Sequence, residues 1–313
     1  MRKIFAHFEL GKILKTESLA TSGNISYLVK TANKTYFLRL CPLGPRWRSQ
    51  GEISAEIELL HYLKKNNFPV IVPIKSKDNQ EVISWKNHYG YLREFTKAKA
   101  KLNPSLLEIE KFGETLGWFH SLVENYKTKK RRQHSFDLAE TQKYFKQKKN
   151  KILKSNFKNK KDFVERYEKE IFTLNFPASL PCGMIHEDLG RRHVLWQGSK
   201  IAAVVDFDRS YFGQLILDLG EAIRGWCFVD GWQKWSKENF TALAEGYQRR
   251  RKLTDLEKHY LSDAIKFGIL ERALAFCQRF VEVTQDSEDQ KFALNSVFRQ
   301  IDLVSKEKAA QSF

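Results

Sequence analysis

The sequence predicts an α+β protein of two lobes, a small β-rich N-terminal lobe and a larger helical C-terminal lobe. A chain of 313 residues is long enough for two lobes that each bury a core. Short β-type runs fill the first hundred residues, and helical periodicity dominates after Phe95. We therefore expect an N-lobe of residues 1–96 and a C-lobe of residues 97–313.

Two hairpins and one helix are expected in the N-lobe. The β-type runs at 24–29 and 35–40 flank a polar turn, and those at 81–85 and 89–95 flank a second turn. Between the hairpins, residues 49–65 carry apolar side chains at helical spacing, which predicts a helix.

Helices are expected through most of the C-lobe. Asn103 is predicted to be the N-cap of a first helix, followed by Pro104. Four apolar residues share one face of that helix: Leu107, Phe112, Leu116 and Phe119. Residues 256–304 also read as mostly helical.

The composition is that of a globular chain, with 42% hydrophobic and 13% aromatic residues, which excludes a disordered or collagen-like protein. The longest apolar run, residues 201–205, is far shorter than the ~20 residues of a membrane helix. The first ten residues hold no apolar stretch typical of a secretory signal. Four scattered cysteines without a CxxC pair indicate neither a zinc ribbon nor a disulfide framework. We expect a cytoplasmic protein that has no membrane partner.

Positive charge is concentrated in one segment. The chain has 54 lysines and arginines against 37 carboxylates, a formal charge of +17. Residues 127–161 carry 14 of these cations against Asp137 and Glu140, a local charge of +12. Apolar residues recur there at roughly helical intervals, which predicts one or two amphipathic helices. Their basic face is either solvated or a wall beside an anion site, and nucleic acid is not an expected partner because no recognition motif accompanies it.

The segment that carries chemistry runs from Met184 to Asp208. A loop bearing His186, Asp188 and His193 leads into a short strand, a turn and an apolar strand that ends at Asp206. Two carboxylates thus follow neighbouring strands, where one can accept a proton and the other can hold a divalent cation. Phosphoryl transfer needs this combination.

The segment resembles the catalytic region of the aminoglycoside and choline kinase superfamily, whose fold is protein-kinase-like. His186, Asp188 and Asp206 fit its H-x-D loop and later Asp, and Asp218 matches a following Asp-Leu element. Within that superfamily the chain is most similar to homoserine kinases of this fold. Three stretches carry that similarity: residues 176–189, 226–228 and 245–248.

The resemblance implies roles for the N-lobe as well. Gly23 and Asn24 lie where the family has its nucleotide-covering loop, and Arg39 takes the place of the lysine that reaches the α/β-phosphates. Glu56 would be the ion-pair partner of Arg39. The connector that binds adenine would include Glu94 and Phe95.

Two positions depart from the family pattern. Arg39 replaces lysine, which keeps the charge but presents a planar fork. His193 stands where the family has Asn, and an imidazole suits softer metals such as Mn²⁺ or Zn²⁺ better than Mg²⁺. Asp208 is expected to be a solvent-exposed residue, and Arg191 and Arg192 are either ligands of an anion or surface residues.

The resemblance implies an ATP- and Mg²⁺-dependent kinase, with Mn²⁺ as an alternative metal, acting on a hydroxyl of a small, homoserine-like metabolite. Asp188 would be the catalytic base, His186 would hold the loop, and Asp206 with His193 would bind metal. An aminoglycoside phosphotransferase is an alternative, although Glu221 and Asp230 are the only nearby carboxylates evident in the sequence. A pseudokinase with a nucleotide-binding, regulatory role is another, because of His193. The acceptor and the oligomeric state stay open.

Overall fold

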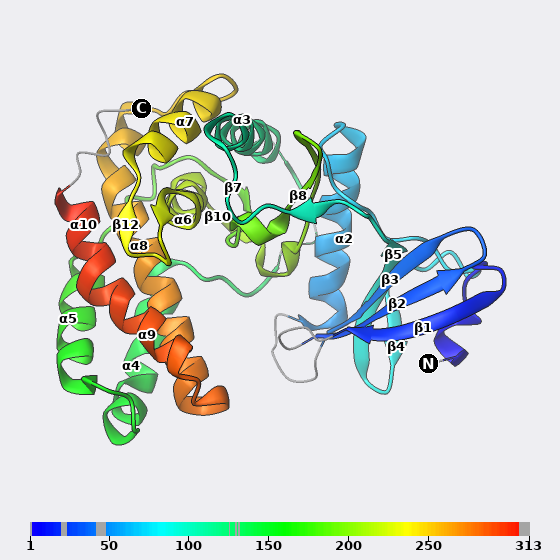
Figure 1. Ribbon diagram of the computed structural model, residues 1–313, viewed down its shortest axis with the longest axis horizontal. Coiled ribbons are helices and arrows are strands. Elements are labelled where there is room, and N and C mark those ends of the chain that lie inside the picture. Colours follow the sequence, from blue (N-terminus) through cyan, green and yellow to red (C-terminus); the bar gives the residue numbers. More distant parts are fainter. Residues whose placement is uncertain are drawn as a thin grey trace. The chain divides into compact units, whose positions relative to one another are not determined.

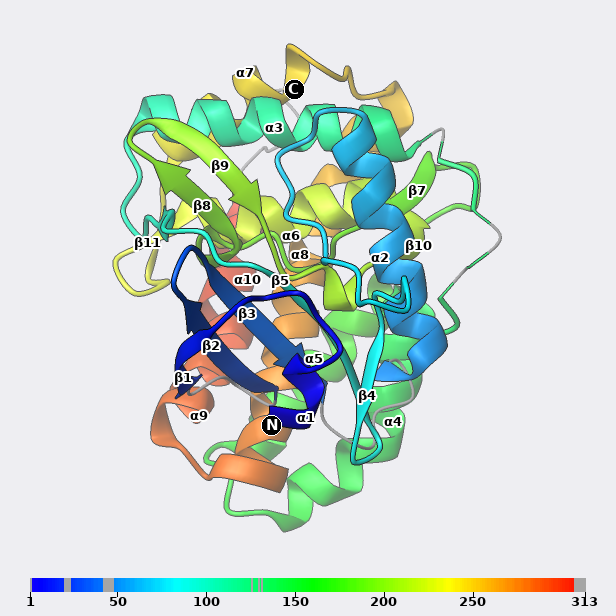
Figure 2. The same cartoon turned by 90° about the vertical axis from the view of Figure 1, so that its right-hand side faces the viewer.

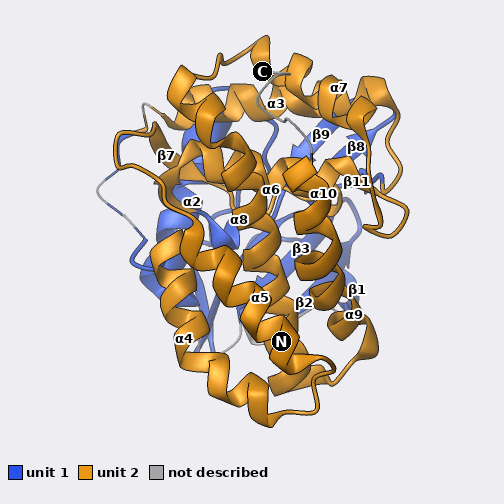
Figure 3. Cartoon of the chain, turned by 90° about the vertical axis from the view of Figure 1, so that its left-hand side faces the viewer, with its two compact units in different colours: residues 1–101, 127–134, 193–210 blue, residues 102–126, 135–192, 211–313 orange. Residues whose placement is uncertain are grey.

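The computed structural model describes residues 2–19, 24–41, 48–124, 126–128, 130 and 132–306. It divides into two compact units, coloured separately in Figure 3. Unit 1 comprises residues 1–101, 127–134 and 193–210, and unit 2 comprises residues 102–126, 135–192 and 211–313. The small antiparallel sheet and the largely helical remainder confirm the predicted α+β class.

Unit 1 is built on a five-stranded antiparallel sheet of order β1-β2-β3-β5-β4 (Figure 1). Its elements are α1 (Arg2–Phe5), β1 (Ile13–Leu19), β2 (Ile25–Thr31), β3 (Thr35–Leu40), α2 (Gln50–Lys65), β4 (Ile83–Trp85), β5 (His88–Glu94), β6 (Lys99–Ala100), β8 (Val194–Gln197) and β9 (Lys200–Val204). Both predicted hairpins and the predicted helix α2, with Ser49 as its N-cap, are therefore confirmed.

The sheet of unit 1 has apolar cores on both sides. Leu38, Leu40 and Leu92 belong to one buried cluster, which includes Phe5 and Phe8 from the N-terminus. A second cluster joins Ile53 and Ile57 of α2 to Tyr91 and Cys41. Helix α2, drawn in Figure 2, therefore covers the sheet with its apolar stripe.

Strands β6, β8 and β9 form a second, three-stranded antiparallel sheet in unit 1. Val204 at the end of β9 makes a parallel bridge to Val70, and its N–H donates to the carbonyl of Pro69 at 2.7 Å. These backbone contacts attach the segment that carries Asp206 to the N-terminal part of the chain.

Unit 2 is mostly helical. Its elements are α3 (Leu106–Val123), α4 (Leu138–Lys154), α5 (Lys160–Thr173), β7 (Cys182–Ile185), β10 (Tyr211–Gln214), α6 (Leu215–Cys227), β11 (Phe228–Val229), β12 (Lys234–Trp235), α7 (Lys237–Gln248), α8 (Asp255–Arg279), α9 (Ser287–Asn295) and α10 (Ile301–Lys306). Short π-helical segments follow α8 and α9 at Phe280–Thr284 and Ser296–Gln300. Within the described part of the chain, no helix has the length and apolar character needed to cross a membrane.

The start of α3 differs from the prediction. Ser105, not Asn103, is the N-cap, because its hydroxyl accepts from the N–H of Glu108 while the Glu108 carboxylate accepts from the N–H of Ser105. This reciprocal capping box satisfies two backbone donors at once, which Asn103 is too far upstream to do.

Two pairs of helices form the centre of unit 2, and glycines allow them to approach closely. Gly113 and Gly117 of α3 face the backbone of α7, and Gly220 of α6 faces the backbone of α8. Figures 1 and 2 show α3 and α7 side by side. The indole of Trp226 is fully buried and stacks on Phe112 with 3.8 Å between ring centroids. Trp226 is therefore a packing residue.

Candidate functional site

A buried carboxylate fixes the first part of the predicted catalytic loop. Strand β7 ends at Ile185, and the backbone N–H groups of His186 and Glu187 donate to the Asp218 carboxylate at 2.9 and 2.7 Å. The imidazole of His186 is fully buried, and its Nδ1 accepts from the N–H of Asp188 at 3.2 Å. His186 thus takes part in the hydrogen bonds that hold the loop.

Asp218 is itself part of a buried network. Nε2 of His120 lies 3.2 Å from the carboxylate, and Nδ1 of His120 lies 2.8 Å from the Tyr247 hydroxyl. Burial raises the pKa of Asp218, but the contact with His120 and the backbone N–H of His186 lower it by more, so the pKa lies below its usual value. The carboxylate is therefore kept ionised beneath the loop.

The side chain of Asp188 lies against an arginine of α8. Nη2 of Arg272 is 3.1 Å from Oδ1 of Asp188 and donates to the carbonyl of Glu187 at 2.9 Å. Nε of the same guanidinium is 3.1 Å from the carboxylate of Glu221. Glu221 in turn accepts two hydrogen bonds from Arg224, at 2.7 and 2.6 Å.

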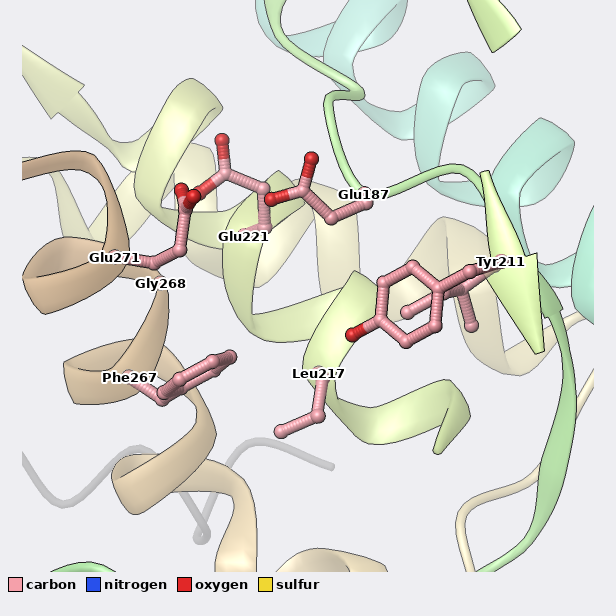
Figure 4. A pocket seen from close by; sticks show the side chains of 8 residues that line it. Glu187, Tyr211, Leu217, Glu221, Phe267, Gly268 and Glu271 are labelled. Atoms are coloured by element: carbon pink, nitrogen blue, oxygen red, sulfur yellow. The ribbon is translucent and has the colours of Figure 1, made fainter. Parts of the chain in front are cut away.

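A cavity of unit 2 lies beside this cluster (Figure 4). Three carboxylates, an aromatic hydroxyl and apolar side chains line it: Ile185, Glu187, Tyr211, Leu217, Glu221, Phe267, Gly268 and Glu271. The Tyr211 side chain is buried, and no described protein group is within hydrogen-bonding distance of its hydroxyl. The cavity adds Glu187 and Glu271 to the nearby carboxylates evident from the sequence. Asp230 is instead exposed and pairs with Lys234 at 2.7 Å.

The open question about Arg191 is answered by its contacts within unit 2. Its guanidinium donates to the carbonyls of Leu102, Trp226 and Phe228 at 2.9, 2.7 and 3.1 Å. The indole N–H of Trp226 donates to the carbonyl of Leu189 at 2.8 Å. Arg191 and Trp226 therefore hold the loop in place through hydrogen bonds to backbone carbonyls. Arg192, in contrast, is exposed.

In unit 1, the structure brings together Arg39, Asp206 and His193. Asp206 follows β9 with φ +74°, in the left-handed region that is uncommon for residues other than glycine. Nη1 of Arg39, on β3, lies 2.8 Å from Oδ1 of Asp206, and Nε2 of His193 lies 3.3 Å from Oδ2. Burial lowers the pKa of Arg39, but Asp206 and Asp208 raise it well above its usual value.

The expectation that Asp208 is exposed is wrong. Its carboxylate is buried and lies 2.6 Å from Nη2 of Arg39 and 2.9 Å from Nη2 of Arg48. Arg48 also donates to the side-chain oxygen of Asn24. Two arginines offset the cost of burying this carboxylate, which no local pattern in the sequence indicates.

Glu56 of α2 is buried near Arg39. Its carboxylate accepts from the Tyr91 hydroxyl at 3.0 Å, and the two carboxylates in direct contact with Arg39 are Asp206 and Asp208. Burial raises the pKa of Glu56, and the charge of Arg39 offsets this rise only in part. Among the described residues, the expected ion pair between Glu56 and Arg39 is therefore not formed, and Asp206 and Asp208 take that place.

The predicted nucleotide-binding positions lie just before β2, on β3 and α2, and at the end of β5. Gly23 lies outside the described residues. Glu94 pairs with Lys34 on the surface, and the N–H of Phe95 donates to the carbonyl of Thr35 at 2.9 Å. Phe95 is 40% exposed.

A divalent cation at Asp206 would need ligands from outside the protein. Among the described residues, no group of three or more His, Cys, Asp or Glu side chains is arranged to hold a metal. Mg²⁺ in kinases is held by one or two protein groups together with phosphate oxygens and water. Asp206, with an exposed fraction of 35%, offers a carboxylate of the required kind.

Sequence reasoning missed Arg272, Glu271 and Tyr211. They lie far from the motif in the chain, so no spacing rule connects them to Asp188. One signal was available, since Glu271 and Arg272 form a charged pair inside an otherwise apolar stretch of α8, residues 267–277. Buried charged side chains need partners of opposite charge, and clusters of such side chains are often found at functional sites.

Comparisons with known proteins identify the family of this chain. The model of the APH phosphotransferase enzyme family matches residues 18–259. Homoserine kinase of Caulobacter vibrioides is 25% identical over 259 residues, covering 81% of this chain and 78% of that protein. Homoserine kinase of Zymomonas mobilis is also 25% identical, over 257 residues that cover 79% and 76%.

Solved structures show the same fold. An amicoumacin kinase in complex with AMP-PNP and Ca²⁺ has a TM-score of 0.72 at 16% identity, covering 94% of this chain and 91% of that one. A microcompartment-associated aminopropanol kinase has a TM-score of 0.70 at 16% identity, covering 95% and 94%. The choline kinase of Streptococcus pneumoniae has a TM-score of 0.64 at 14% identity, covering 98% and 97%.

Proposed function

The chain belongs to the APH phosphotransferase enzyme family, and from this premise we propose that it is an ATP-dependent kinase that phosphorylates a hydroxyl of a small, homoserine-like metabolite. The curated relatives named above are homoserine kinases, and the similarity covers four-fifths of the chain. The observation that carries the proposal is the fixed loop: buried Asp218 anchors its backbone, and Arg272 contacts the Asp188 carboxylate.

Asp188 is proposed to be the general base. Its carboxylate orients the acceptor hydroxyl and takes its proton as the oxygen attacks the γ-phosphorus of ATP. The bond between that phosphorus and the β–γ bridging oxygen breaks, and ADP leaves. Because the loop backbone is hydrogen-bonded to a buried carboxylate, the position of Asp188 is set before substrate binds.

The N-lobe, residues 1–96, is proposed to bind ATP. Gly23 and Asn24 would cover the phosphates, and Arg39, under the influence of Glu56, would contact the α/β-phosphates. Glu94 and Phe95 would bind the adenine. Asp206, with His193 beside it, would hold Mg²⁺ or Mn²⁺, and the bound ion would neutralise charge on the β- and γ-phosphates. We propose that the reaction takes place in the cytoplasm, as the sequence led us to expect.

An aminoglycoside-type acceptor is a second candidate, because three carboxylates, those of Glu187, Glu221 and Glu271, lie near Asp188 in unit 2. Only part of their charge is offset by Arg224 and Arg272. Cationic amino groups of an acceptor are favoured near such a group of carboxylates, although the cavity between them is itself too small to hold the acceptor. In this candidate the acceptor is larger and carries more charges than homoserine. The reaction, transfer of a phosphoryl group from ATP to a hydroxyl, is the same.

The test is ADP release with homoserine, choline and a panel of aminoglycosides, each with Mg²⁺ and with Mn²⁺. We expect turnover with homoserine, and a loss of about 10²–10⁴-fold for Asp188→Ala. The variant His193→Asn distinguishes an enzyme from a pseudokinase. If it turns over substrate with Mg²⁺ faster than the native protein does, the site is catalytic and His193 limits its use of Mg²⁺. If no acceptor is turned over by either protein, the catalytic proposal is wrong.

A further inference from the structure

We propose that Arg272 is a positioning residue of the phosphotransfer reaction, which fixes the Asp188 carboxylate and keeps it ionised. The inference rests on the proposed role of Asp188 as the base. It assigns a function to a residue of α8 that lies 84 positions after Asp188 in the chain and belongs to none of the motifs.

The guanidinium of Arg272 bridges the side chain of the base and the backbone that carries it. Nη2 is 3.1 Å from Oδ1 of Asp188 and 2.9 Å from the carbonyl oxygen of Glu187. One planar group therefore fixes the carboxylate relative to its own loop. The fork also places Nε 3.1 Å from the Glu221 carboxylate. A lysine ammonium is a single nitrogen, so it cannot contact Asp188 and Glu187 and also keep the Glu221 contact that orients the guanidinium.

The backbone at Glu187 needs such support. Glu187 has φ +71°, in the left-handed region that residues with a Cβ rarely adopt. Its N–H donates to Asp218 on one side and its carbonyl accepts from Arg272 on the other. Hydrogen bonds to the N–H and to the carbonyl of Glu187 thus fix the turn that precedes Asp188.

Arg272 is in turn held firmly. Its side chain is about nine-tenths buried, with Nε 3.1 Å from Glu221 and 3.3 Å from Glu271. Arg224 fixes Glu221 through two hydrogen bonds, so the group that orients Arg272 is itself oriented. Burial alone lowers the pKa of Arg272, but Asp188, Glu187 and Glu221 raise it well above its usual value, so the cation is permanent.

The charges around Asp188 within unit 2 come from three elements. Arg272 and Glu271 lie on α8, Glu221 and Arg224 lie on α6, and Glu187 and His186 belong to the loop itself. Arg272 is the cation in direct contact with Asp188 among these groups. An adjacent guanidinium favours the ionised carboxylate, whereas the glutamates disfavour it, so removing Arg272 is expected to raise the pH at which Asp188 titrates.

The experiment compares Arg272→Met and Arg272→Lys with a matched control, Arg279→Met. Arg279 lies two turns further along α8 and pairs with Asp289, away from the loop. The measurements are kcat and KM for ATP with homoserine, thermal unfolding, and the titration of Asp188 in protein labelled with ¹³C-aspartate. The Asp188→Asn spectrum identifies the resonance.

We expect Arg272→Met to lower kcat about 10²-fold while KM for ATP changes less than about threefold, because the base is displaced and the nucleotide contacts are not. The Asp188 titration midpoint should rise by about one pH unit or more. Arg272→Lys should keep the titration midpoint of Asp188 close to that of the native protein, since lysine retains the positive charge. Its kcat should still fall, because lysine loses the second nitrogen that contacts Glu221. Arg279→Met should match the native protein in both measurements.

The proposal is overturned if a folded Arg272→Met or Arg272→Lys protein has native kcat, or if the Asp188 midpoint is unchanged in Arg272→Met. If Arg272→Met does not fold, the kcat of Arg272→Lys decides. Should the native protein turn over no acceptor, the proposed kinase function fails, and the titration still decides whether Arg272 holds Asp188 ionised.

Discussion

At the scale of single residues, the carboxylate of Asp218 lies fully buried beneath the loop that carries His186 and Asp188. It accepts two backbone hydrogen bonds from the loop and contacts His120. A carboxylate can accept from all of these donors at once, whereas an amide presents donors of its own to some of them. The loop conformation therefore depends on the charge of residue 218 as well as on its shape.

We expect Asp218→Asn to lower the free energy of unfolding by about 3 kcal/mol, because buried donors lose their ionised partner. Activity should fall with it, since the same donors position the loop. Thermal unfolding and kcat measure the two effects, and Asp230→Asn, at an exposed carboxylate, is the control. Native stability in Asp218→Asn would show that the loop does not depend on this anchor.

Asp208 shows what a motif cannot supply. It follows Asp206 by two positions, and its surroundings come from β3 and from residue 48. Arg39 and Arg48 are 169 and 160 positions away, so the local sequence carries no sign of the pairing. Asp188 and Asp206 were accessible to sequence reasoning because the spacing along one short segment identifies them. Their catalytic and metal-binding roles remain proposals.

At the scale of elements, α3 and α7 pack so closely that glycine is required at the contact. A Cβ on Gly246 would overlap the carbonyl oxygen of Glu110, and a Cβ on Gly117 would lie 2.5 Å from the carbonyl oxygen of Tyr247. Close contact between helix backbones leaves no room for a side chain without a shift of the helices. The contact also positions Tyr247, which bonds to His120 below the loop.

We expect Gly246→Ala to lower the free energy of unfolding by about 1–3 kcal/mol through overpacking. The matched control is Gly51→Ala in α2, where the added methyl group meets only Ser49 Oγ at 3.9 Å. Alanine is the better helix former, so the control should gain stability, by up to about 1 kcal/mol. Urea unfolding of both variants checks the pair, and equal effects would mean that the α3–α7 contact tolerates a side chain.

A second element-scale contact joins α2 to residues 132–134. Glu52 receives a hydrogen bond from Arg132 at 2.5 Å and one from the N–H of Gln133 at 2.9 Å, and His134 lies 3.1 Å away. Burial raises the pKa of Glu52, but these partners lower it to about 2. A lowered pKa stabilises the fold above the ordinary glutamate pKa and ceases to do so as the pH falls through the folded value.

We therefore expect the stability that comes from Glu52 to disappear between about pH 4.5 and pH 2. In that range the free energy of unfolding of the native protein should fall more steeply than that of Glu52→Gln, by up to about 3 kcal/mol in total. Urea unfolding at a series of pH values measures the difference. Parallel curves for the two proteins would exclude Glu52 as a source of the acid sensitivity.

At the scale of the whole chain, the features predicted best are those encoded locally. The hairpins and α2 follow from periodicity within a few residues. The capping box is also a local pattern, because Ser105 and Glu108 are three residues apart, although Asn103 was predicted as the N-cap. Strand β1 was not predicted, because most of its side chains are exposed and show little alternation. Arg272 was missed because its partners are distant in the sequence and close only after folding.

The structure shows the ion-pair partners of several cations in the basic segment, residues 127–161, which carries most of the net charge of +17. Arg132 of the basic segment is buried against Glu52 in unit 1. Within unit 2, Lys148 and Lys151 pair with Glu282, and Lys149 pairs with Glu168. Helix α4 is amphipathic, as predicted, and these ion pairs favour the interpretation of its basic face as a solvated surface over a nucleic-acid site.

Binding of nucleotide and metal should stabilise the whole molecule, because a ligand that binds only the folded chain adds its binding free energy to folding. At 100 times its dissociation constant, AMP-PNP with Mg²⁺ is expected to add about 2.7 kcal/mol, which raises Tm by several degrees. Asp206→Ala should lose the Mg²⁺-dependent part of the shift and keep the part seen with nucleotide alone, since Arg39 remains paired with Asp208.

Thermal unfolding with nucleotide, with Mg²⁺, and with both separates these contributions, and Asp230→Ala serves as the surface control. Asp206 is proposed to provide the carboxylate that binds the metal. The additional rise in Tm when nucleotide and Mg²⁺ are present together should therefore depend on Asp206 and not on Asp230. The same coupling in Asp206→Ala as in the native protein would place the metal elsewhere. An absence of any shift with nucleotide in the native protein would contradict ATP binding by the N-lobe.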